Sequence, residues 1–156
     1  MISGIKPELI AELHGNSKLM ICLSCDKKIS HEEDKWDKRY WGAGYRTNPT
    51  RDGQPTCPHC EGRIISSVVN FGDPLPDEDY YKSRVHSELA DVYLILGSSL
   101  VVFPAADLPE LARKKGAKTI LINVGETPFD NLVAIKIEDK IGDILTRIVE
   151  RVKTNL

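Results

Sequence analysis

Hydrophobic and polar positions follow two different patterns along the chain, and the change falls near Ser66. From there on, short apolar runs alternate with segments whose apolar residues recur every three or four positions, the signatures of strands and helices. The expected strands cover residues 66–72, 91–97, 118–123 and 132–137, and the expected helices lie at 77–91, within 104–117 and at 141–156. Strands and helices alternating in this order are typical of a parallel α/β sheet.

Several positions sharpen this prediction. The run at 91–97 is apolar throughout, as expected for a strand that is covered on both faces of a sheet. Pro109 should delay or kink the helix within 104–117, and Gly116 should end it. Two helices carry apolar stripes, which are Tyr81, Val85 and Leu89 in the first, and Ile141, Ile144, Leu145, Ile148 and Val152 in the last.

The chain before Ser66 shows little such periodicity. It divides into a short lead-in at residues 1–19, which contains His14-Gly15, and a cysteine-containing module at residues 20–65. We therefore expect an α/β protein in which a partial Rossmann-like parallel sheet with helices, at residues 66–156, follows a small module. By itself, a histidine ahead of the cysteines is more simply interpreted as a turn residue than as a catalytic base.

The module contains all four cysteines as two CxxC pairs, Cys22/Cys25 and Cys57/Cys60. Two such pairs supply the four thiolates of a closed tetrahedral zinc site, in which no position remains open for catalysis. A redox-active CxxC and unpaired buried cysteines are the alternatives. His59 lies inside the second pair and is a competing ligand, although the cysteines are favoured.

Between the two pairs, the segment at 36–46 mixes aromatic and basic residues: Trp36, Lys38, Arg39, Tyr40, Trp41 and Arg46. Such interleaving is found on surfaces that bind single-stranded nucleic acid or phosphate. The simpler interpretation is that Trp36, Tyr40 and Trp41 form a small hydrophobic core of the lobe, the segment between the two CxxC pairs. The Gly-Ala-Gly at 42–44 does not qualify as a dinucleotide loop, because no strand precedes it and no amphipathic helix follows.

Composition narrows the class of protein. The 156 residues carry a formal charge of -2, 41% of them are hydrophobic and 28% are charged, which is the balance of a globular domain. This charge favours neither nucleic acid nor anionic lipid as a partner. No apolar run is long enough to span a membrane, and the first residues lack the layout of a signal peptide. We expect an intracellular protein without a membrane partner.

Two turns of the expected sheet suit a nucleotide. Gly97, Ser98 and Ser99 follow a buried strand and precede a helix, where backbone N–H groups and hydroxyls approach a phosphate or ribose. Asn123 ends the next strand, at the carboxyl edge where open parallel sheets bind ligands. Each signal is also compatible with an ordinary turn or strand end.

Six ordered motifs together resemble the sirtuins, the NAD-dependent protein deacylases. They are ELHGN, the two CxxC pairs, VVNFGDPLP, LGSSLVVFPAADLP, ILIN and the final IGDIL, and the similarity runs from about Ser3 to the C-terminus. The resemblance implies an enzyme that transfers an acyl group from lysine to ADP-ribose. Its cofactors would be NAD and a structural Zn²⁺, and its substrate an acyl-lysine protein or peptide.

The resemblance also implies residue roles. His14 matches the catalytic histidine, which deprotonates a ribose hydroxyl, a task suited to a base whose pKa lies near neutrality. The four cysteines match the zinc ligands. Val69, Phe71 and Gly72 match the strand that pairs with the acyl-lysine peptide by β-augmentation. Gly97, Ser98 and Ser99 match the loop that contacts the ribose and phosphates of NAD, and Asn123 matches a contact to the adenosine ribose.

Some sirtuin motifs do not occur in these 156 residues: the GAGxS phosphate loop, the Arg-bearing cofactor lid and the TQNxD segment. Residues 66–156 therefore correspond to the C-terminal half of the NAD-binding domain, and we expect the chain to be inactive alone. A split gene, a non-catalytic peptide- or nucleic-acid-binding descendant, and a subunit completed by a partner all account for this. The sheet edge left open predicts a complementing N-terminal half or self-association.

Overall fold

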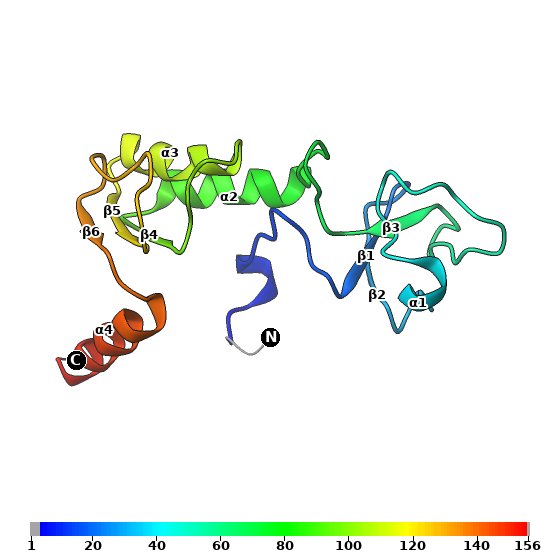
Figure 1. The fold of residues 1–156 in the computed structure, drawn as a ribbon, viewed down its shortest axis with the longest axis horizontal. Helices are drawn as coiled ribbons and strands as arrows, with labels where there is room; N and C mark the ends of the chain where they lie inside the picture. The colour runs from blue at the N-terminus through cyan, green and yellow to red at the C-terminus, as the bar shows by residue number, and fades with distance from the viewer. Residues whose placement is uncertain (1–3, 156) are drawn as a thin grey trace. The chain divides into compact units, whose positions relative to one another are not determined.

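The computed structural model describes residues 4–155, so the first three residues of the expected lead-in, and Leu156, lie outside the described part. The chain forms two compact units, Met1–Tyr80 and Tyr81–Leu156 (Figure 1). The boundary falls within helix α2 (Asp77–Leu89), and each unit has its own hydrophobic core.

The first unit is built on an antiparallel sheet of three short strands in the order β2-β1-β3. These are β1 (Leu19–Cys22), β2 (Lys28–Ser30) and β3 (Ile64–Ser66), and a short 3-10 helix, η1 (Pro7–Leu9), precedes them. Their registers pair Met20 with Ile29 on one side and with Ser66 on the other. Met20, Ile29 and Ile64 are completely buried, so this small sheet carries the core of the unit.

The strand expected at 66–72 is wrong. Strand β3 ends at Ser66, and residues 67–73 form an irregular segment with a turn in which the N–H of Asp73 donates to the carbonyl of Asn70. The N–H of Ser67 still donates to Leu19 of β1, but the next backbone contact leaves the sheet, because the N–H of Val69 donates to His14 in the turn before β1. Apolar pattern alone did not distinguish such a segment from a strand.

The aromatic segment at 36–46 only partly forms the core of its lobe. Trp36 is 5% exposed and belongs to the core, and Trp41, in helix α1 (Lys38–Trp41), packs against it half-buried. Tyr40 is 69% exposed, which corrects the expectation that all three aromatics are core residues. The Asp37 side chain caps α1 by accepting a hydrogen bond from the N–H of Arg39.

The second unit contains the expected parallel sheet, in the order β4-β5-β6. Its strands are β4 (Val92–Leu96), β5 (Lys118–Ile122) and β6 (Ile135–Ile137), and helix α3 (Leu108–Lys114) packs on β4 and β5 (Figure 1). A buried cluster of Ile95, Leu121, Leu100 and Phe129 lies on one face. The Rossmann-like α/β prediction is confirmed, with β6 shorter than expected.

Pro109 and Gly116 mark where α3 begins and ends. Helix η2 (Ala105–Asp107) comes first, and α3 then begins at Leu108 with Pro109 in its first turn, where the missing N–H costs nothing. Lys115 is the C-cap of the helix, and Gly116 follows it with a φ of +102° and an N–H that donates to the carbonyl of Arg113. The predicted delay at Pro109 and stop at Gly116 are confirmed.

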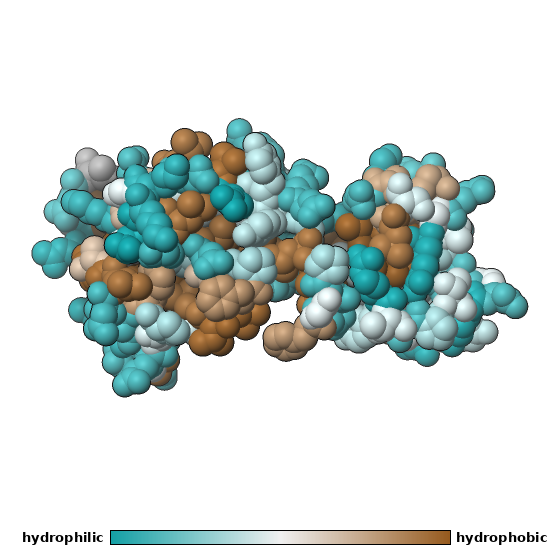
Figure 2. Space-filling view, turned by 90° about the horizontal axis from the view of Figure 1, so that it is seen from above, coloured by the Kyte–Doolittle hydropathy of each residue, from teal (hydrophilic) through white to brown (hydrophobic). Residues whose placement is uncertain are grey.

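One face of the parallel sheet is bare, which corrects the expectation that strand 91–97 is covered on both faces. Leu94, Ile120 and Ile135 lie in register across the three strands, and Leu94 and Ile135 are each 51% exposed. The predicted stripes are also not buried: Tyr81 and Leu89 of α2 are 71% and 74% exposed, and no described residue of α4 (Ile141–Thr154) is buried. Apolar side chains reach the surface in both units (Figure 2). The described elements leave this surface uncovered.

None of the described helices has the length and apolar character that crossing a membrane requires.

Candidate functional site

The four cysteines meet at one end of the antiparallel sheet. All four sulfur atoms lie within 4.8 Å of one another, with 3.5 Å between Cys22 and Cys60 and 3.7 Å between Cys25 and Cys57. Four thiolates at about 2.3 Å from a tetrahedral zinc ion are about 3.8 Å apart. The spacing therefore fits a Zn²⁺ ion held by four cysteines.

The two CxxC pairs fold as matching turns. In the first, the N–H of Ser24 donates to the sulfur of Cys22; in the second, the N–H of His59 donates to the sulfur of Cys57. The residues that follow, Asp26 and Glu61, both adopt left-handed backbone angles, with φ of 55° and 59°. Backbone donors aimed at sulfur stabilise the thiolate form, which is the form that binds metal.

Nearby N–H groups and neighbouring sulfur atoms change the pKa values of Cys22 and Cys60. Burial raises the pKa of Cys22, but N–H groups of Ser24 and Cys25 and the thiol of Cys60 outweigh it and lower that pKa to about 7. The N–H of Gly62 lowers the pKa of Cys60, yet its sulfur neighbours raise it to about 12. Several thiolates so close together repel one another, and a divalent cation removes that repulsion.

His59 faces away from this cluster. Its Nε2 lies 3.3 Å from a carboxylate oxygen of Glu33, and among the described residues the group of potential ligands contains the four cysteines without it. The cysteine set is therefore the better ligand set.

His14 lies in a turn that is tied to the segment after β3. The N–H of Val69 donates to the carbonyl of His14 over 3.1 Å. Ser67 accepts a hydrogen bond from the N–H of Asn16 through Oγ and donates to its carbonyl. Gly15 adopts a φ of +72°, and a Cβ at this position would lie 1.7 Å from the carbonyl oxygen of Ser67. The structure thus places His14 beside Val69, while Phe71 is 94% exposed and Gly72 adopts a φ of +87°.

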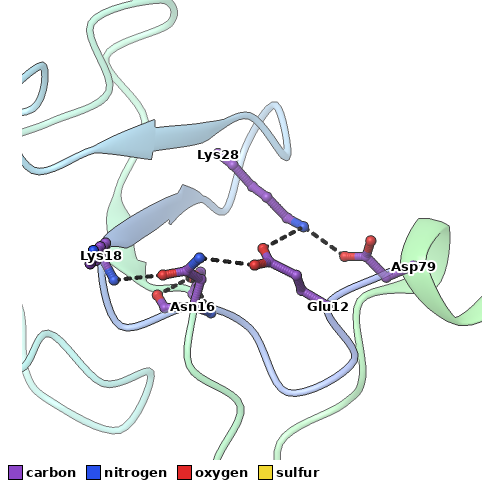
Figure 3. A network of polar contacts seen from close by, with 6 residues as sticks. Glu12, Asn16, Lys18, Lys28 and Asp79 are labelled. Carbon is purple, nitrogen blue, oxygen red and sulfur yellow. Dashed lines mark hydrogen bonds and ion pairs between the residues drawn. The ribbon is translucent and has the colours of Figure 1, made fainter. Parts of the chain in front are cut away.

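A polar network also holds the histidine turn, through Glu12 and Asn16 (Figure 3). Lys28 of β2 reaches Asp79 of α2 at 2.7 Å and Glu12 at 3.9 Å, and Glu12 accepts a hydrogen bond from the Asn16 side chain. Asp79 is only 5% exposed, so its carboxylate depends on a cationic partner. Lys28 therefore connects the metal-binding sheet, the histidine turn and the start of α2.

Replacing Lys28 with Met is expected to destabilise the zinc-loaded chain by about 1–2 kcal/mol, because Asp79 loses the cation that compensates its burial. Denaturant unfolding measures the effect. Lys27→Met is the matched control, since Lys27 is exposed next to it and a surface change of this kind costs about 0.5 kcal/mol or less. Equal losses in the two variants would show that the Lys28 contact contributes nothing.

The second unit brings the other expected residues to one edge of its sheet. The N–H of Gly97 donates to Ile122, so the turn at 97–99 and Asn123 lie side by side at the carboxyl ends of β4 and β5. Ser98 Oγ accepts a hydrogen bond from the N–H of Leu100 and closes the turn. Asn123 stands between β5 and β6, donating through its N–H to Ile137. Open parallel sheets bind ligands at this edge.

Sequence reasoning missed the residues that hold the histidine turn: Glu12, Asn16, Lys28, Ser67 and Asp79. The only local signal was the four-residue spacing of Glu12 and Asn16, whose side chains are hydrogen-bonded. The contacts of Asn16 with Ser67 and of Lys28 with Asp79 join residues that are 51 positions apart, and Lys28 is also distant in sequence from Glu12, so no local pattern reveals them.

Comparison with known proteins gives a consistent result. A model of the Sir2 family matches residues 2–104. The chain is 34% identical to NAD-dependent protein deacetylase 1 of Pyrobaculum aerophilum and 35% identical to NAD-dependent protein deacylase 2 of Archaeoglobus fulgidus, each over 145 residues. These alignments cover 92% of this chain and 52% and 53% of the relatives, so the chain spans about half their length.

Solved structures agree with these matches. A structure of Sir2 bound to an acetylated peptide is similar with a TM-score of 0.73 at 30% identity, covering 97% of this chain and 58% of that one. A complex of Sir2 with a p53 peptide and NAD+ is similar with a TM-score of 0.69 at 31% identity, covering 92% and 55%.

Proposed function

The chain belongs to the Sir2 family, and on that premise we propose that it contributes the zinc module, the catalytic histidine and a nucleotide-binding edge to an NAD-dependent protein lysine deacylase. The relatives it matches are named NAD-dependent protein deacetylases or deacylases. The observation that carries the proposal is the contact between the His14 turn and residues 67–69. This contact joins the ELHGN motif to the VVNFGDPLP motif, which lies more than 50 residues further along the chain.

Each unit has its part in this proposal. The imidazole of His14, exposed in a turn that these hydrogen bonds hold, takes a proton from a ribose hydroxyl of the cosubstrate. Residues Val69, Phe71 and Gly72 offer backbone and an exposed aromatic side chain to an acyl-lysine peptide. Gly97, Ser98, Ser99 and Asn123 bind the ribose and phosphate groups of NAD. The four cysteines hold Zn²⁺, which fixes the lobe without taking part in the chemistry.

The open sheet supports the further proposal that activity requires additional polypeptide. Within the described residues β4 pairs only with β5, and Val92, Leu94 and Leu96 of β4 are 55%, 51% and 38% exposed. An apolar strand with a free edge pairs readily with another strand. We propose that a complementing N-terminal half, or a second copy in its absence, covers this strand and the bare face.

We expect a polypeptide of these 156 residues to release no nicotinamide from NAD and an acetyl-lysine peptide. Joining it to the part of the Archaeoglobus fulgidus relative that lies outside the match should restore deacylation, because the phosphate loop and the missing strands are then supplied. Mass spectrometry of the peptide and of nicotinamide measures both. Turnover by the 156 residues alone would contradict the need for a complement, and a joined protein that binds acetyl-lysine peptide without turnover would favour a non-catalytic binding module.

A further inference from the structure

The zinc lobe contains a cavity that the proposed deacylase chemistry does not use. Its volume is about 410 Å³, within the range of small-molecule sites. Three aromatic residues line it, Trp36, Trp41 and Tyr45, together with two arginines, Arg51 and Arg63. All of these belong to the first unit, whereas the edge proposed for NAD belongs to the second.

Trp36 and Trp41 form the aromatic wall of the cavity, and contacts with neighbouring residues fix their positions. The indole N–H of Trp36 donates to the carbonyl of Gly42 over 3.0 Å, and its ring centroid lies 6.4 Å from that of Trp41. Gly44 packs so closely on Trp36 that a Cβ there would come within 2.8 Å of the indole ring. A rigid, preformed aromatic surface binds a flat ring at little entropic cost.

The charge of the cavity is positive. No acidic residue is among those that line it, and two guanidinium groups, those of Arg51 and Arg63, supply its positive charge. Arg51 lies over the Trp41 ring, with its Cζ 5.2 Å from the ring centroid, and one of its nitrogens donates to the carbonyl of Tyr40.

Arg63 has an unused donor. One terminal nitrogen donates to the carbonyls of Asn48 and Arg46, but its Nε is buried and has no hydrogen-bond partner in the described part of the chain. The hydrogen bonds of the Arg63 guanidinium go to backbone carbonyls, so within the described residues no carboxylate compensates its positive charge.

We propose that this cavity binds a nucleotide, with the base stacked on the Trp41–Arg51 layer and the phosphate held by the two guanidinium groups. Stacking on an aromatic ring and charge-assisted hydrogen bonds from arginine are the two interactions that nucleotides use in such sites. A neutral acyl-lysine chain would give the two arginine charges no anionic partner, and an acidic peptide would give the aromatic rings no flat partner. A free mononucleotide and a nucleotide of single-stranded nucleic acid share this chemistry.

The test uses the natural fluorescence of the zinc-loaded chain. The sequence contains two tryptophans, and both line the cavity, so their emission reports on binding there. Adenosine monophosphate and a short oligothymidylate are each expected to quench the emission saturably, while ribose 5-phosphate quenches it weakly because it has no base. Tighter binding of the oligonucleotide with a steep salt dependence identifies nucleic acid as the source, and equal affinities identify a free nucleotide.

Arg51→Gln is expected to weaken nucleotide binding about tenfold, because one charge-assisted contact and the stacking partner of the base are lost. Arg39→Gln is the matched control: Arg39 lies in the same lobe, is paired with Asp37 at 2.9 Å and does not line the cavity. Absence of saturable quenching by either nucleotide probe, or equal effects of the two substitutions, would overturn the proposal.

Discussion

Replacing Cys57 with Ser should remove zinc from the protein and unfold the first unit, the largest effect we expect of any single substitution. Cys22 and Cys57 are 0% and 1% exposed and belong to the same core cluster as Met20 and Ile29, so the metal site and the core are one structure. Zinc binding to a structural site contributes about 10–16 kcal/mol, which exceeds the stability of a typical small domain. The unsubstituted protein should contain one zinc ion per chain.

Elemental analysis of the purified protein and amide hydrogen exchange in residues 19–30 and 64–66 measure the two consequences. His59→Ala is the matched control, because His59 lies inside the second CxxC pair but faces Glu33. It should keep both zinc and exchange protection. A folded, metal-free Cys57→Ser protein, or zinc loss in His59→Ala, would contradict the four-cysteine site.

Replacing Gly15 with Ala should cost about 3 kcal/mol or more and separate the histidine turn from residues 67–69. The added Cβ would lie 1.7 Å from the carbonyl oxygen of Ser67, a backbone atom that no side-chain rotation can move away. The left-handed angle of Gly15 adds about 1 kcal/mol of its own.

Gly53→Ala separates the two contributions. Gly53 has almost the same φ, +71°, but a Cβ there would meet nothing within 4 Å, so this variant should lose only about 1 kcal/mol. Denaturant unfolding of both variants gives the difference. Equal losses would mean that the close approach of Gly15 to Ser67 does not exist in solution.

The sequence was most informative where a pattern is local. The three parallel strands follow from their apolar runs, the limits of α3 follow from Pro109 and Gly116, and the cysteine cluster follows from the spacing of two CxxC pairs. In each case a few neighbouring residues contain the whole physical cause.

Prediction failed where the partner of a residue is distant or is not part of the described chain. The apolar pattern of residues 66–72 predicts a strand, but the N–H of Val69 and the side chain of Ser67 form hydrogen bonds with the histidine turn, about 50 positions earlier. The run at 91–97 is as apolar as a doubly covered strand, yet Leu94 is half exposed because the described elements cover one face only. The contacts of Lys28 depend on three elements meeting, which periodicity does not encode.

The most direct test of the account is the rate of peptide deacylation by the joined protein after replacement of His14 with Ala. If His14 is the base that deprotonates the ribose, the rate should fall by about 10²–10⁴-fold while acetyl-lysine peptide binding is retained. His86→Ala, at an exposed position of α2, should leave the rate unchanged. Deacylation at the unsubstituted rate in His14→Ala would contradict the central claim that this turn carries the catalytic base.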